Sequence, residues 1–473
     1  MKIFLVIPPN IHYIEPYAYV EADKSNAIRP NLGLLYIAAA VKDMPEIDIR
    51  IVDMNLDGIS MEGLERLISV ESPDIVGFSV LTFNLLNCME ACKVVRRASP
   101  RTKICFGGWH PTLYPEETLE FNFVDYIVVG EGELTFKELV ELCLDKAGVS
   151  AEKLATINGL GYKTPDGKTV INPPRQVVKK LDELPLPAYD LVDATKYSHL
   201  LASGQVVNIM TSRGCPQKCV FCDLRRSPYR FRTPQNILSE IRFWVNKGVK
   251  EFFIQDDNFT INRTRTIEFC RLLMDAGLDI KYKISSRVDY IDDATAEHLK
   301  KSGCYAIYFG VESGSQRVLD YLQKGITIED IKRAFAAGRK FGIDCCAYIM
   351  IGVPTETRED IDMTMKLVKE IHPSHLHCSI CTPMPRTYLY SKMMEEGIIE
   401  HDYWLDFARK PDPSFKTPFA SRLYSAEELR AMQNAIQKQF YLNPHVILHE
   451  IVKTRGLKQF VAKFQMALKM IFH

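Results

Sequence analysis

The sequence lacks a long hydrophobic run, an excess of one charge and a low-complexity segment. No apolar run reaches the roughly 18 residues that a membrane-spanning helix needs, so no transmembrane segment is expected. Lys plus Arg and Asp plus Glu both number 59, so no overall charge favours binding to nucleic acid. No helix-turn-helix with a basic face is found, which argues against a DNA-binding regulator.

A disulfide scaffold is also not expected. The chain has 13 cysteines, an odd number in a long sequence, and residues 1–4 do not resemble a signal peptide. Disulfide-rich scaffolds are short secreted chains, so these cysteines indicate a reducing cytoplasm. The 473 residues predict two or three domains, and 47% hydrophobic residues are enough for sizeable cores.

Three cysteines form the most informative motif. Cys215, Cys219 and Cys222 lie within eight residues in the spacing Cys-x3-Cys-x2-Cys. Soft thiolates select Fe–S clusters, zinc or Cu(I), and three of them can hold three irons of a [4Fe–4S] cluster while the fourth iron stays open. A structural zinc site needs a fourth ligand. The distant pair Cys378 and Cys381 keeps a closed zinc site, or a second cluster, as alternatives to two buried thiols in a strand.

Phe221, just before the last cysteine, completes the pattern Cys-x3-Cys-x-aromatic-Cys. This segment resembles the hallmark of the radical SAM superfamily. The resemblance implies that the open iron chelates S-adenosylmethionine, and that the reduced cluster cleaves it to a 5′-deoxyadenosyl radical. It also implies an electron donor such as a flavodoxin or ferredoxin.

Residues 1–150 alternate between short apolar strands and helical patterns. Strands are expected at 3–7, 49–52, 74–79, 103–107 and 125–129, with helices near 33–43, 61–70, 84–98 and 133–146. Continuous apolar strands separated by helices are typical of a parallel, doubly wound Rossmann-like sheet. Ligands of such sheets bind beyond the carboxyl ends of the strands.

Small and polar residues follow several of these strands. The segments Gly-Gly-x-His-Pro-Thr and Gly-Glu-Gly-Glu resemble those of cobalamin-binding domains that precede many radical SAM cores. The resemblance implies cobalamin contacts at Ser79, Leu81, Thr82, Gly107, Gly108, Gly130, Glu131, Gly132 and Glu133. The Asp-x-His-x-x-Gly motif that ligates cobalt is missing from residues 10–15, so His12 is only a weak candidate for a lower ligand. A sheet domain that binds nothing is the alternative.

Residues 151–204 predict a small hairpin and a Pro-rich linker. A second series of strands follows in residues 205–400, at 205–210, 251–255, 282–287, 306–312, 346–352 and 375–380. Six strand–helix units predict a partial, TIM-like (β/α)6 barrel with functional residues at the carboxyl ends of its strands.

Residues at these strand ends are the candidate contacts of S-adenosylmethionine. Glu312 can pair with its amino group, and Arg287 can bind its carboxylate bidentately. Gly352 resembles the glycine on the adenine side in this family, and Asp256 and Phe221 complete the set. A structural ion pair, a helix cap or a plain turn glycine is the alternative at each site. No general base is assigned, because radical hydrogen abstraction does not require one.

Residues 401–473 predict a helical C-terminal extension. Leu457, Phe460, Val461, Phe464, Leu468 and Ile471 form a stripe flanked by lysines and Arg455. A basic amphipathic helix can lie in a membrane surface, and packing on the barrel is the alternative. The membrane hypothesis places the protein in the cytoplasm at the inner membrane face.

These patterns together predict an enzyme that uses a [4Fe–4S] cluster, S-adenosylmethionine and cobalamin to methylate an unactivated carbon of a hydrophobic substrate. The order of the domains and the tail resemble enzymes that act on lipids or tetrapyrroles. Radical carbon–carbon bond formation, cyclisation or ring rearrangement is the close alternative. A non-enzymatic Fe–S or zinc sensor is the alternative from another class.

Overall fold

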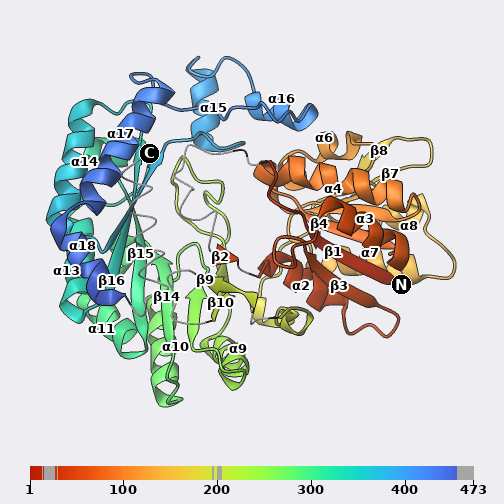
Figure 1. The fold of residues 1–473 in the computed structure, drawn as a ribbon, viewed down its shortest axis with the longest axis horizontal. Helices are drawn as coiled ribbons and strands as arrows, with labels where there is room; N and C mark the ends of the chain where they lie inside the picture. Colours follow the sequence, from red (N-terminus) through yellow and green to blue (C-terminus); the bar gives the residue numbers. More distant parts are fainter. Residues whose placement is uncertain (13, 15–26, 29, 194–195, 200–204, 455–473) are drawn as a thin grey trace. The chain divides into compact units, whose positions relative to one another are not determined.

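The computed structural model describes residues 1–12, 14, 27–28, 30–193, 196–199 and 205–454. The chain divides into two compact units and passes between them several times. The first unit comprises Met1–Glu15, Pro30–Lys196 and Asp402–Lys416, and the second comprises Pro16–Arg29, Tyr197–His401 and Thr417–His473. Figure 1 shows their helices and strands.

The first unit is built on a sheet of order β3-β1-β4-β5-β6-β7-β8 in the described part of the chain. The strands from β3 to β6 pair in parallel, whereas β7 and β8 join as an antiparallel hairpin. Their bounds are β1 (Lys2–Ile7), β3 (Asp48–Asp53), β4 (Ile75–Ser79), β5 (Lys103–Gly107), β6 (Tyr126–Val128), β7 (Leu160–Lys163) and β8 (Thr169–Ile171). The predicted doubly wound parallel sheet is therefore confirmed.

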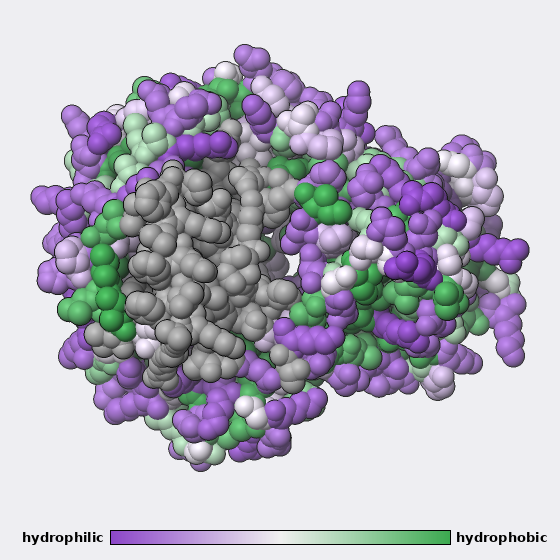
Figure 2. Space-filling view, viewed as in Figure 1, coloured by the Kyte–Doolittle hydropathy of each residue, from purple (hydrophilic) through white to green (hydrophobic). Residues whose placement is uncertain are grey.

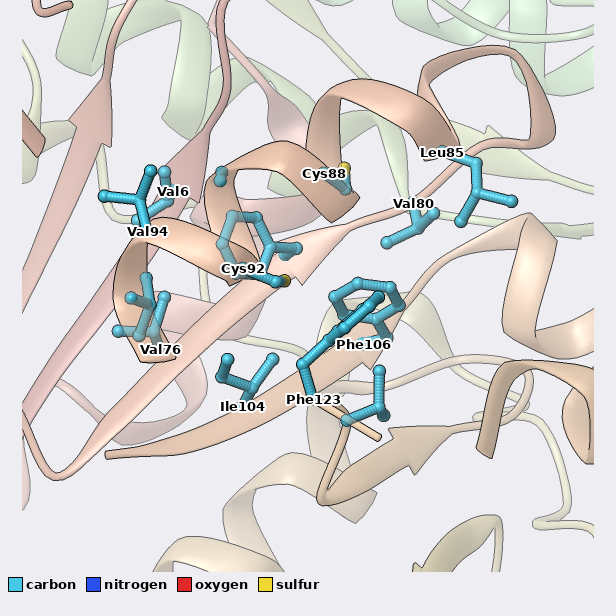
Figure 3. Close-up of a cluster of buried hydrophobic side chains, with 14 of the residues drawn as sticks. Val6, Val76, Val80, Leu85, Cys88, Cys92, Val94, Ile104, Phe106 and Phe123 are labelled. Carbon is cyan, nitrogen blue, oxygen red and sulfur yellow. The ribbon is translucent and has the colours of Figure 1, made fainter. Parts of the chain in front are cut away.

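Helices cover both faces of this sheet because successive strand residues point to opposite sides. On one face Val6, Val76 and Phe106 pack with α3 and α4, as Figure 3 shows for part of this cluster. On the other face Leu5 and Ile75 pack with α2 and α7. The helices of this part of the unit are α2 (Leu32–Val41), α3 (Met61–Glu71), α4 (Leu85–Ala98), α5 (Trp109–Leu113), α6 (Pro115–Glu120), α7 (Glu133–Leu144) and α8 (Ala151–Leu154), with 3₁₀ turns η1 (Thr82–Asn84), η2 (Leu181–Glu183) and η3 (Tyr189–Leu191).

Helix α16 (Tyr403–Arg409) belongs to the first unit, although the sequence analysis grouped it with the C-terminal extension. Trp404 is fully buried and packs edge-on against Phe83, with ring centroids 5.8 Å apart. Phe415 contacts Trp404 and Phe407 at 5.1 and 4.6 Å between centroids. The segment thus completes the core of a unit whose other residues lie more than 200 positions earlier.

The second unit holds a parallel sheet of order β10-β13-β14-β15-β16-β17, as far as the described residues extend. These strands are β10 (Val206–Ile209), β13 (Glu251–Ile254), β14 (Lys281–Ser286), β15 (Cys304–Glu312), β16 (Asp344–Ile351) and β17 (His375–Ile380). They match the six predicted strands within a few residues. Two short antiparallel pairs, not predicted, are β2 (Ala27–Ile28) with β9 (Ser198–His199) and β11 (Ser212–Arg213) with β12 (Arg230–Phe231).

Each crossover contains a helix that packs on one face of this sheet (Figure 1). Several start at capping boxes: Thr327 and Asp330 cap α13, and Thr357 and Asp360 cap α14, which satisfies backbone donors at the helix start. The helices are α9 (Pro234–Asn246), α10 (Arg263–Asp275), α11 (Asp293–Lys301), α12 (Gln316–Tyr321), α13 (Ile328–Phe341), α14 (Arg358–Ile371) and α15 (Tyr388–Glu395), with the 3₁₀ turn η5 (Val288–Tyr290).

Helix α17 (Ala426–Tyr441) packs against β17, the last strand of the sheet. Gln433 donates to the carbonyl oxygen of Cys378 at 2.7 Å, and the hydroxyl of Tyr441 donates to that of Leu376 at 2.9 Å. These side chains satisfy carbonyl groups of the strand that would otherwise face an open edge. The sheet is therefore closed on this side by a helix.

Helix α18 (Pro444–Lys453) ends the described chain. The predicted amphipathic stripe from Leu457 to Ile471 lies outside the described residues. Among the residues that are described, no helix is both long and apolar enough to span a bilayer. On the face shown in Figure 2, most coloured side chains are hydrophilic and the hydrophobic ones form small groups.

Candidate functional site

The three cysteines lie in the loop after β10, at the carboxyl end of the second sheet. Gly214 has a φ of +83°, and a Cβ there would lie 2.2 Å from the carbonyl oxygen of Pro228, so only glycine fits this approach. The N–H of Cys215 donates to Ser227 Oγ at 2.7 Å. Farther on, Val220 donates to Leu322 and accepts from Leu389 at 3.0 and 2.8 Å. Hydrogen bonds therefore hold both the first and the second half of the cysteine loop in place.

The thiols of the loop lie close enough to influence one another. Burial, together with the neighbouring Asp223, Cys219 and Cys215, raises the pKa of Cys222 to about 12. Burial also raises the pKa of Cys215, and Cys219 adds to the effect. Three thiolates repel one another, so a cationic metal centre is the group that would hold them deprotonated together. The donor set therefore fits an Fe–S cluster.

No three His, Cys, Asp or Glu side chains of the described residues converge as ligands of a single metal ion. Cluster-bound cysteines need not converge, because each binds a different iron. Cys378 and Cys381 are fully buried at the end of β17, and burial raises the pKa of each thiol well above its ordinary range.

Asp256 follows β13 and is tied to the start of the cysteine loop. Its carboxylate accepts hydrogen bonds from the N–H and hydroxyl groups of both Thr211 and Ser212, at 2.5 to 3.0 Å. Arg265 donates to the carbonyl of Thr211 at 2.8 Å. Asp256 is 4% exposed. Its hydrogen bonds fix the backbone at Thr211 and Ser212, directly before the cysteine loop.

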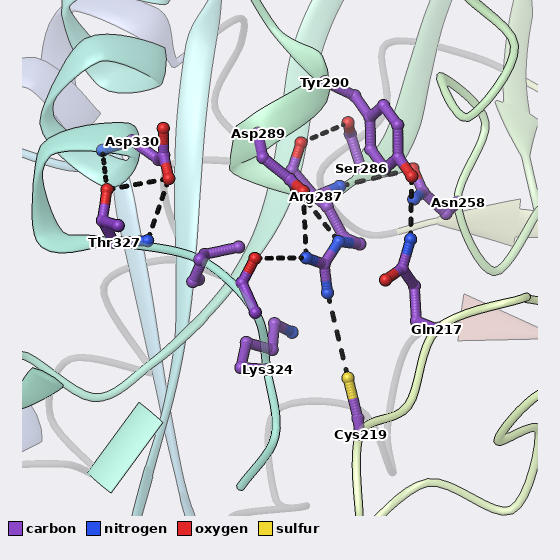
Figure 4. A network of polar contacts seen from close by, with 12 residues as sticks. Gln217, Cys219, Asn258, Ser286, Arg287, Asp289, Tyr290, Lys324, Thr327 and Asp330 are labelled. Carbon is purple, nitrogen blue, oxygen red and sulfur yellow. Dashed lines mark hydrogen bonds and ion pairs between the residues drawn. The ribbon is translucent and has the colours of Figure 1, made fainter. Parts of the chain in front are cut away.

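Arg287, at the end of β14, approaches the cysteine loop directly (Figure 4). Its Nε and Nη2 atoms each donate to Asp289 at 3.0 Å, and its Nη1 lies 3.9 Å from the sulfur of Cys219. Gln217 in the same loop donates to the hydroxyl of Tyr290 at 2.7 Å. The guanidinium is therefore oriented by a carboxylate and faces one of the three thiols.

Glu312 ends β15 in the left-handed region, with a φ of +62°. Lys324, which is 7% exposed, donates to its carboxylate at 2.6 Å. The ammonium group of Lys324 also lies 5.7 Å from the centroid of the Phe221 ring. A Cβ on Gly310 would lie 2.5 Å from Glu312 and 2.7 Å from Lys324, so this glycine makes room for the ion pair.

Gly352, directly after β16, has a φ of +80°. Its N–H donates to Glu356 at 2.6 Å, and that of Val353 donates to the same oxygen at 3.4 Å. The other oxygen of Glu356 is buried without a hydrogen bond, and burial raises the pKa of this carboxyl to about 7. Glu356 thus shapes the turn that carries Gly352.

The sequence analysis did not identify Asp289, Lys324 or Glu356. Glu356 stands four residues after Gly352, and this short spacing is the one signal that could have found it. Lys324 reaches Glu312 from the far side of α12, twelve residues away. Nothing in the sequence marks that contact.

At the carboxyl edge of the first sheet, Ser79 and Gly107 end the neighbouring strands β4 and β5. Gly108 has a φ of +97°, and a Cβ there would lie 2.8 Å from the carbonyl oxygen of Val80. Leu81 and Trp109 are 43% and 40% exposed beside these glycines. Backbone can therefore come close to a flat ligand at this edge, with apolar side chains next to it.

Polar residues behind this edge support its loops. Thr82 is buried, and its hydroxyl lies 3.1 Å from Nδ1 of the fully buried His110. Burial lowers the pKa of His110 to about 3, so this imidazole is neutral. Gly130 donates to the hydroxyl of Thr112 at 2.9 Å.

The Gly-Glu-Gly-Glu segment leads from β6 into α7. Gly130 has a φ of +81°, Gly132 is the N-terminal cap of the helix and Glu133 is buried in its first turn. An acidic side chain is favourable at that helix end. Glu131 is half-buried beside them.

His12 lies in a loop after β1 whose backbone is held by Asn87. The amide of Asn87 accepts from the N–H of His12 at 2.7 Å and donates to its carbonyl at 2.6 Å. His12 as a whole is half-buried.

Comparison with known proteins identifies both units. Residues 209–368 match the radical SAM superfamily and residues 22–140 match the B12 binding domain. An uncharacterized methyltransferase of Pyrococcus horikoshii is 33% identical over 96% of both chains. An anaerobic magnesium-protoporphyrin IX monomethyl ester cyclase of Rubrivivax gelatinosus is 30% identical over 91% of this chain and 77% of that protein.

A solved structure shares the fold. The cobalamin-dependent S-adenosylmethionine radical enzyme OxsB, with aqua-cobalamin and S-adenosylmethionine bound, superposes with a TM-score of 0.74 at 18% identity, over 99% of this chain and 71% of that one. The predicted order of a cobalamin-type sheet followed by a parallel barrel-like sheet is thus confirmed. The chain belongs to the radical SAM superfamily, among the enzymes that carry a B12-binding domain ahead of the radical SAM core.

Proposed function

We propose that the protein is a cobalamin-dependent methyltransferase that acts on an unactivated carbon of a hydrophobic substrate. The observation that carries this proposal is the presence in one chain of a fixed three-cysteine loop and of a glycine-lined sheet edge in a B12-binding domain. The methyltransferase of Pyrococcus horikoshii, which matches nearly the whole chain, supports the choice of methyl transfer.

Cys215, Cys219 and Cys222 would hold the cluster, which when bound supplies the electron that cleaves S-adenosylmethionine. Glu312 would bind the amino group of that molecule, beside Phe221. Arg287, held against Cys219, would meet its carboxylate. Asp256 would keep the loop in position, and Gly352 would admit the adenine. Glu312 accepts a hydrogen bond from Lys324 at 2.6 Å, and a carboxylate can also accept from an ammonium group.

Cobalamin would bind at the carboxyl edge of the first sheet. Ser79, Leu81, Thr82, Gly107 and Gly108 would contact it from β4 and β5. The segment Gly130–Glu133 would contact it from the loop before α7. His12 remains the weak candidate for a lower ligand.

Ring closure is the second candidate reaction, because the cyclase of Rubrivivax gelatinosus is 30% identical over most of this chain. Either reaction needs an electron donor such as a flavodoxin or ferredoxin, and neither involves nucleic acid. We place the protein in the cytoplasm, with residues 455–473 as an amphipathic contact to the inner membrane face when the substrate is a lipid.

Anaerobic reconstitution with iron, sulfide and hydroxocobalamin tests the proposal. The wild-type protein should bind about four irons, retain corrin absorbance through gel filtration, and form 5′-deoxyadenosine from S-adenosylmethionine with dithionite. Cys219→Ala should lose iron and deoxyadenosine. Cys143→Ser, a half-buried thiol of the first unit, is the matched control and should lose neither.

Methyl transfer and ring closure are separated by their products. Methyl transfer yields S-adenosylhomocysteine together with deoxyadenosine and methionine, whereas radical cyclisation yields deoxyadenosine and methionine without S-adenosylhomocysteine. A Cys219→Ala protein that still cleaves S-adenosylmethionine would refute the proposed cluster site.

A further inference from the structure

Helix α18 carries an exposed apolar face near the end of the described chain. Elsewhere in the described residues, exposed large hydrophobic side chains are scattered singly, and no ten-residue stretch holds two of them. Four fall within ten residues here and are between 41% and 61% exposed: Leu442, Ile447, Leu448 and Ile451. Single exposed apolar side chains are ordinary, whereas a group of them marks a surface that contacts something.

Three of these side chains share one side of the helix. Ile447 and Leu448 are neighbours, and Ile451 follows them by four and three positions. Residues three and four apart lie on the same face of an α-helix. The helix is capped by Asn443, whose side chain accepts from the N–H of His445 at 2.9 Å. We call Ile447, Leu448 and Ile451 the α18 stripe.

Helix α17 ties this region to the second sheet. Tyr441, the last residue of α17, donates to the carbonyl oxygen of Leu376 in β17 at 2.9 Å. The N–H of Leu442 donates to the carbonyl oxygen of Lys438 at 2.9 Å and so completes the last turn of α17. Helix α18 begins two residues after Leu442. The α18 stripe therefore follows directly on a helix that is anchored to the sheet.

The sequence that ends the chain is basic. Residues 451–473 contain five cationic side chains and no Asp or Glu, although acidic and basic residues are equal in number over the whole chain. The five are Lys453, Arg455, Lys458, Lys463 and Lys469. An exposed apolar helix face followed by a local excess of positive charge suits the surface of a bilayer that contains anionic lipids.

We infer that the α18 stripe docks on an anionic lipid bilayer, with Leu448 and Ile451 inserted at the headgroup level and the following cations attracted to lipid phosphates. The inference rests on the proposed function, which assigns a membrane contact to residues 455–473, and adds an apolar anchor next to the sheet. A second copy of the chain suits the stripe less well, because a symmetric pair would bring two sets of five cations together. A hydrophobic substrate could then be taken from the bilayer to which the second unit is bound.

Flotation of the full-length protein with lipid vesicles tests this inference. One set of vesicles is phosphatidylcholine alone, and the other also contains phosphatidylglycerol. Wild type should bind the anionic vesicles at least about tenfold more tightly, because each cation near an anionic surface is worth about fivefold in affinity. Salt at about 1 M, where the screening length is about 3 Å, should remove most of this difference.

Substitutions in the stripe test its part directly. Leu448→Ser combined with Ile451→Ser should weaken binding to anionic vesicles by about tenfold or more, because two aliphatic side chains no longer enter the interface. Leu448→Phe combined with Ile451→Leu keeps the face apolar and should retain binding. The matched control is Leu423→Ser combined with Met363→Ser, which removes two equally exposed side chains (58% and 51%) elsewhere in the second unit. This control should bind like wild type.

Two results would overturn the inference. One is equal binding of wild type to neutral and anionic vesicles, or unchanged binding after Leu448→Ser with Ile451→Ser. The other is a wild-type dimer in sedimentation velocity that the same double variant dissociates, with no binding to vesicles, because the stripe would then join two copies of the chain.

Deoxyadenosine formation by the reconstituted proteins, measured without vesicles, separates this inference from the proposed function. The Leu448→Ser, Ile451→Ser variant should form deoxyadenosine at the wild-type rate, because the stripe is not part of the cluster site. Deoxyadenosine without vesicle binding by wild type overturns the docking surface and leaves the proposed function standing. Vesicle binding without deoxyadenosine overturns the proposed function and leaves the docking surface standing.

Discussion

The contact between Arg287 and Cys219 predicts how the protein sets the reduction potential of its cluster. The guanidinium nitrogen lies 3.9 Å from the sulfur, and Asp289 holds the guanidinium by two bonds of 3.0 Å. A positive charge next to a cluster ligand favours the reduced state, because reduction adds an electron. The carboxylate behind it opposes this effect from a greater distance.

The magnitude follows from these distances. A unit charge at 3.9 Å is worth about 4 kcal/mol at an effective dielectric constant of about 20. The opposite charge of Asp289 cancels about two thirds of this electrostatic energy. The net stabilisation of the reduced cluster by the Arg287–Asp289 pair is then about a third, roughly 1.4 kcal/mol. For a one-electron couple this corresponds to about 59 mV.

Arg287→Gln removes the whole guanidinium contribution and leaves Asp289 unopposed, so it should lower the midpoint potential of the cluster by about 180 mV. Asp289→Asn should raise it by about 120 mV, because the guanidinium charge is then no longer opposed. The measurement is an anaerobic redox titration followed by electron paramagnetic resonance without S-adenosylmethionine, on proteins with equal iron content. Shifts of the same sign in both variants, or no shift in either, would refute this account of the contact.

Three further predictions concern the framework. Gly108→Ala should abolish retention of hydroxocobalamin in gel filtration, because the new Cβ would lie 2.8 Å from the carbonyl oxygen of Val80. The control Gly148→Ala should retain cobalamin, because Gly148 has a similar φ of +81° but no atom within 4 Å of the new Cβ. Burial raises the pKa of Glu356 to about 7, so the folded state binds the proton more tightly than the unfolded state. Wild type should therefore lose stability from about pH 4.5 to above pH 7, by at most about 3 kcal/mol, and thermal melts of Glu356→Gln should show less of this loss. Gln433→Leu should speed amide exchange in β17 by about tenfold, since it leaves a buried carbonyl without its main donor at a cost of about 1–2 kcal/mol; unchanged exchange would contradict the edge-closing role of α17.

Local patterns account for most of what the sequence predicts correctly. The cysteine loop, the strands and the glycines at strand ends are each specified within about ten residues, so their periodicity and spacing are visible in the sequence. Lys103–Gly107 and His375–Ile380 match the predicted strands residue for residue. The first sheet was predicted as parallel for the same reason, since its strands are apolar throughout and separated by helices.

Contacts between distant residues are where sequence reasoning stops. Asp256 was predicted as a cofactor contact, and its fourfold bonding to Thr211 and Ser212 spans some 45 positions that no periodicity connects. Whether it also touches a cofactor stays a prediction. Lys324 was missed because a buried lysine is indistinguishable in sequence from an exposed one until its carboxylate partner is known.

Residues 402–416 are the clearest example of a contact between distant residues, because this segment packs in the first unit although it follows most of the second unit in the chain. Trp404 and Phe407 stand three residues apart, a spacing typical of any helix that packs on a core, but the pattern does not say which core. The sequence placed them with the neighbouring helical tail, on the assumption that consecutive elements pack together. In the structure Trp404 packs against Phe83, 321 positions earlier. The core of the first unit therefore includes a segment that follows most of the second unit in the sequence. Trp404→Ala would therefore leave a cavity beside Phe83 and should destabilise the B12-binding unit rather than the radical SAM core, which limited proteolysis of the two units can distinguish.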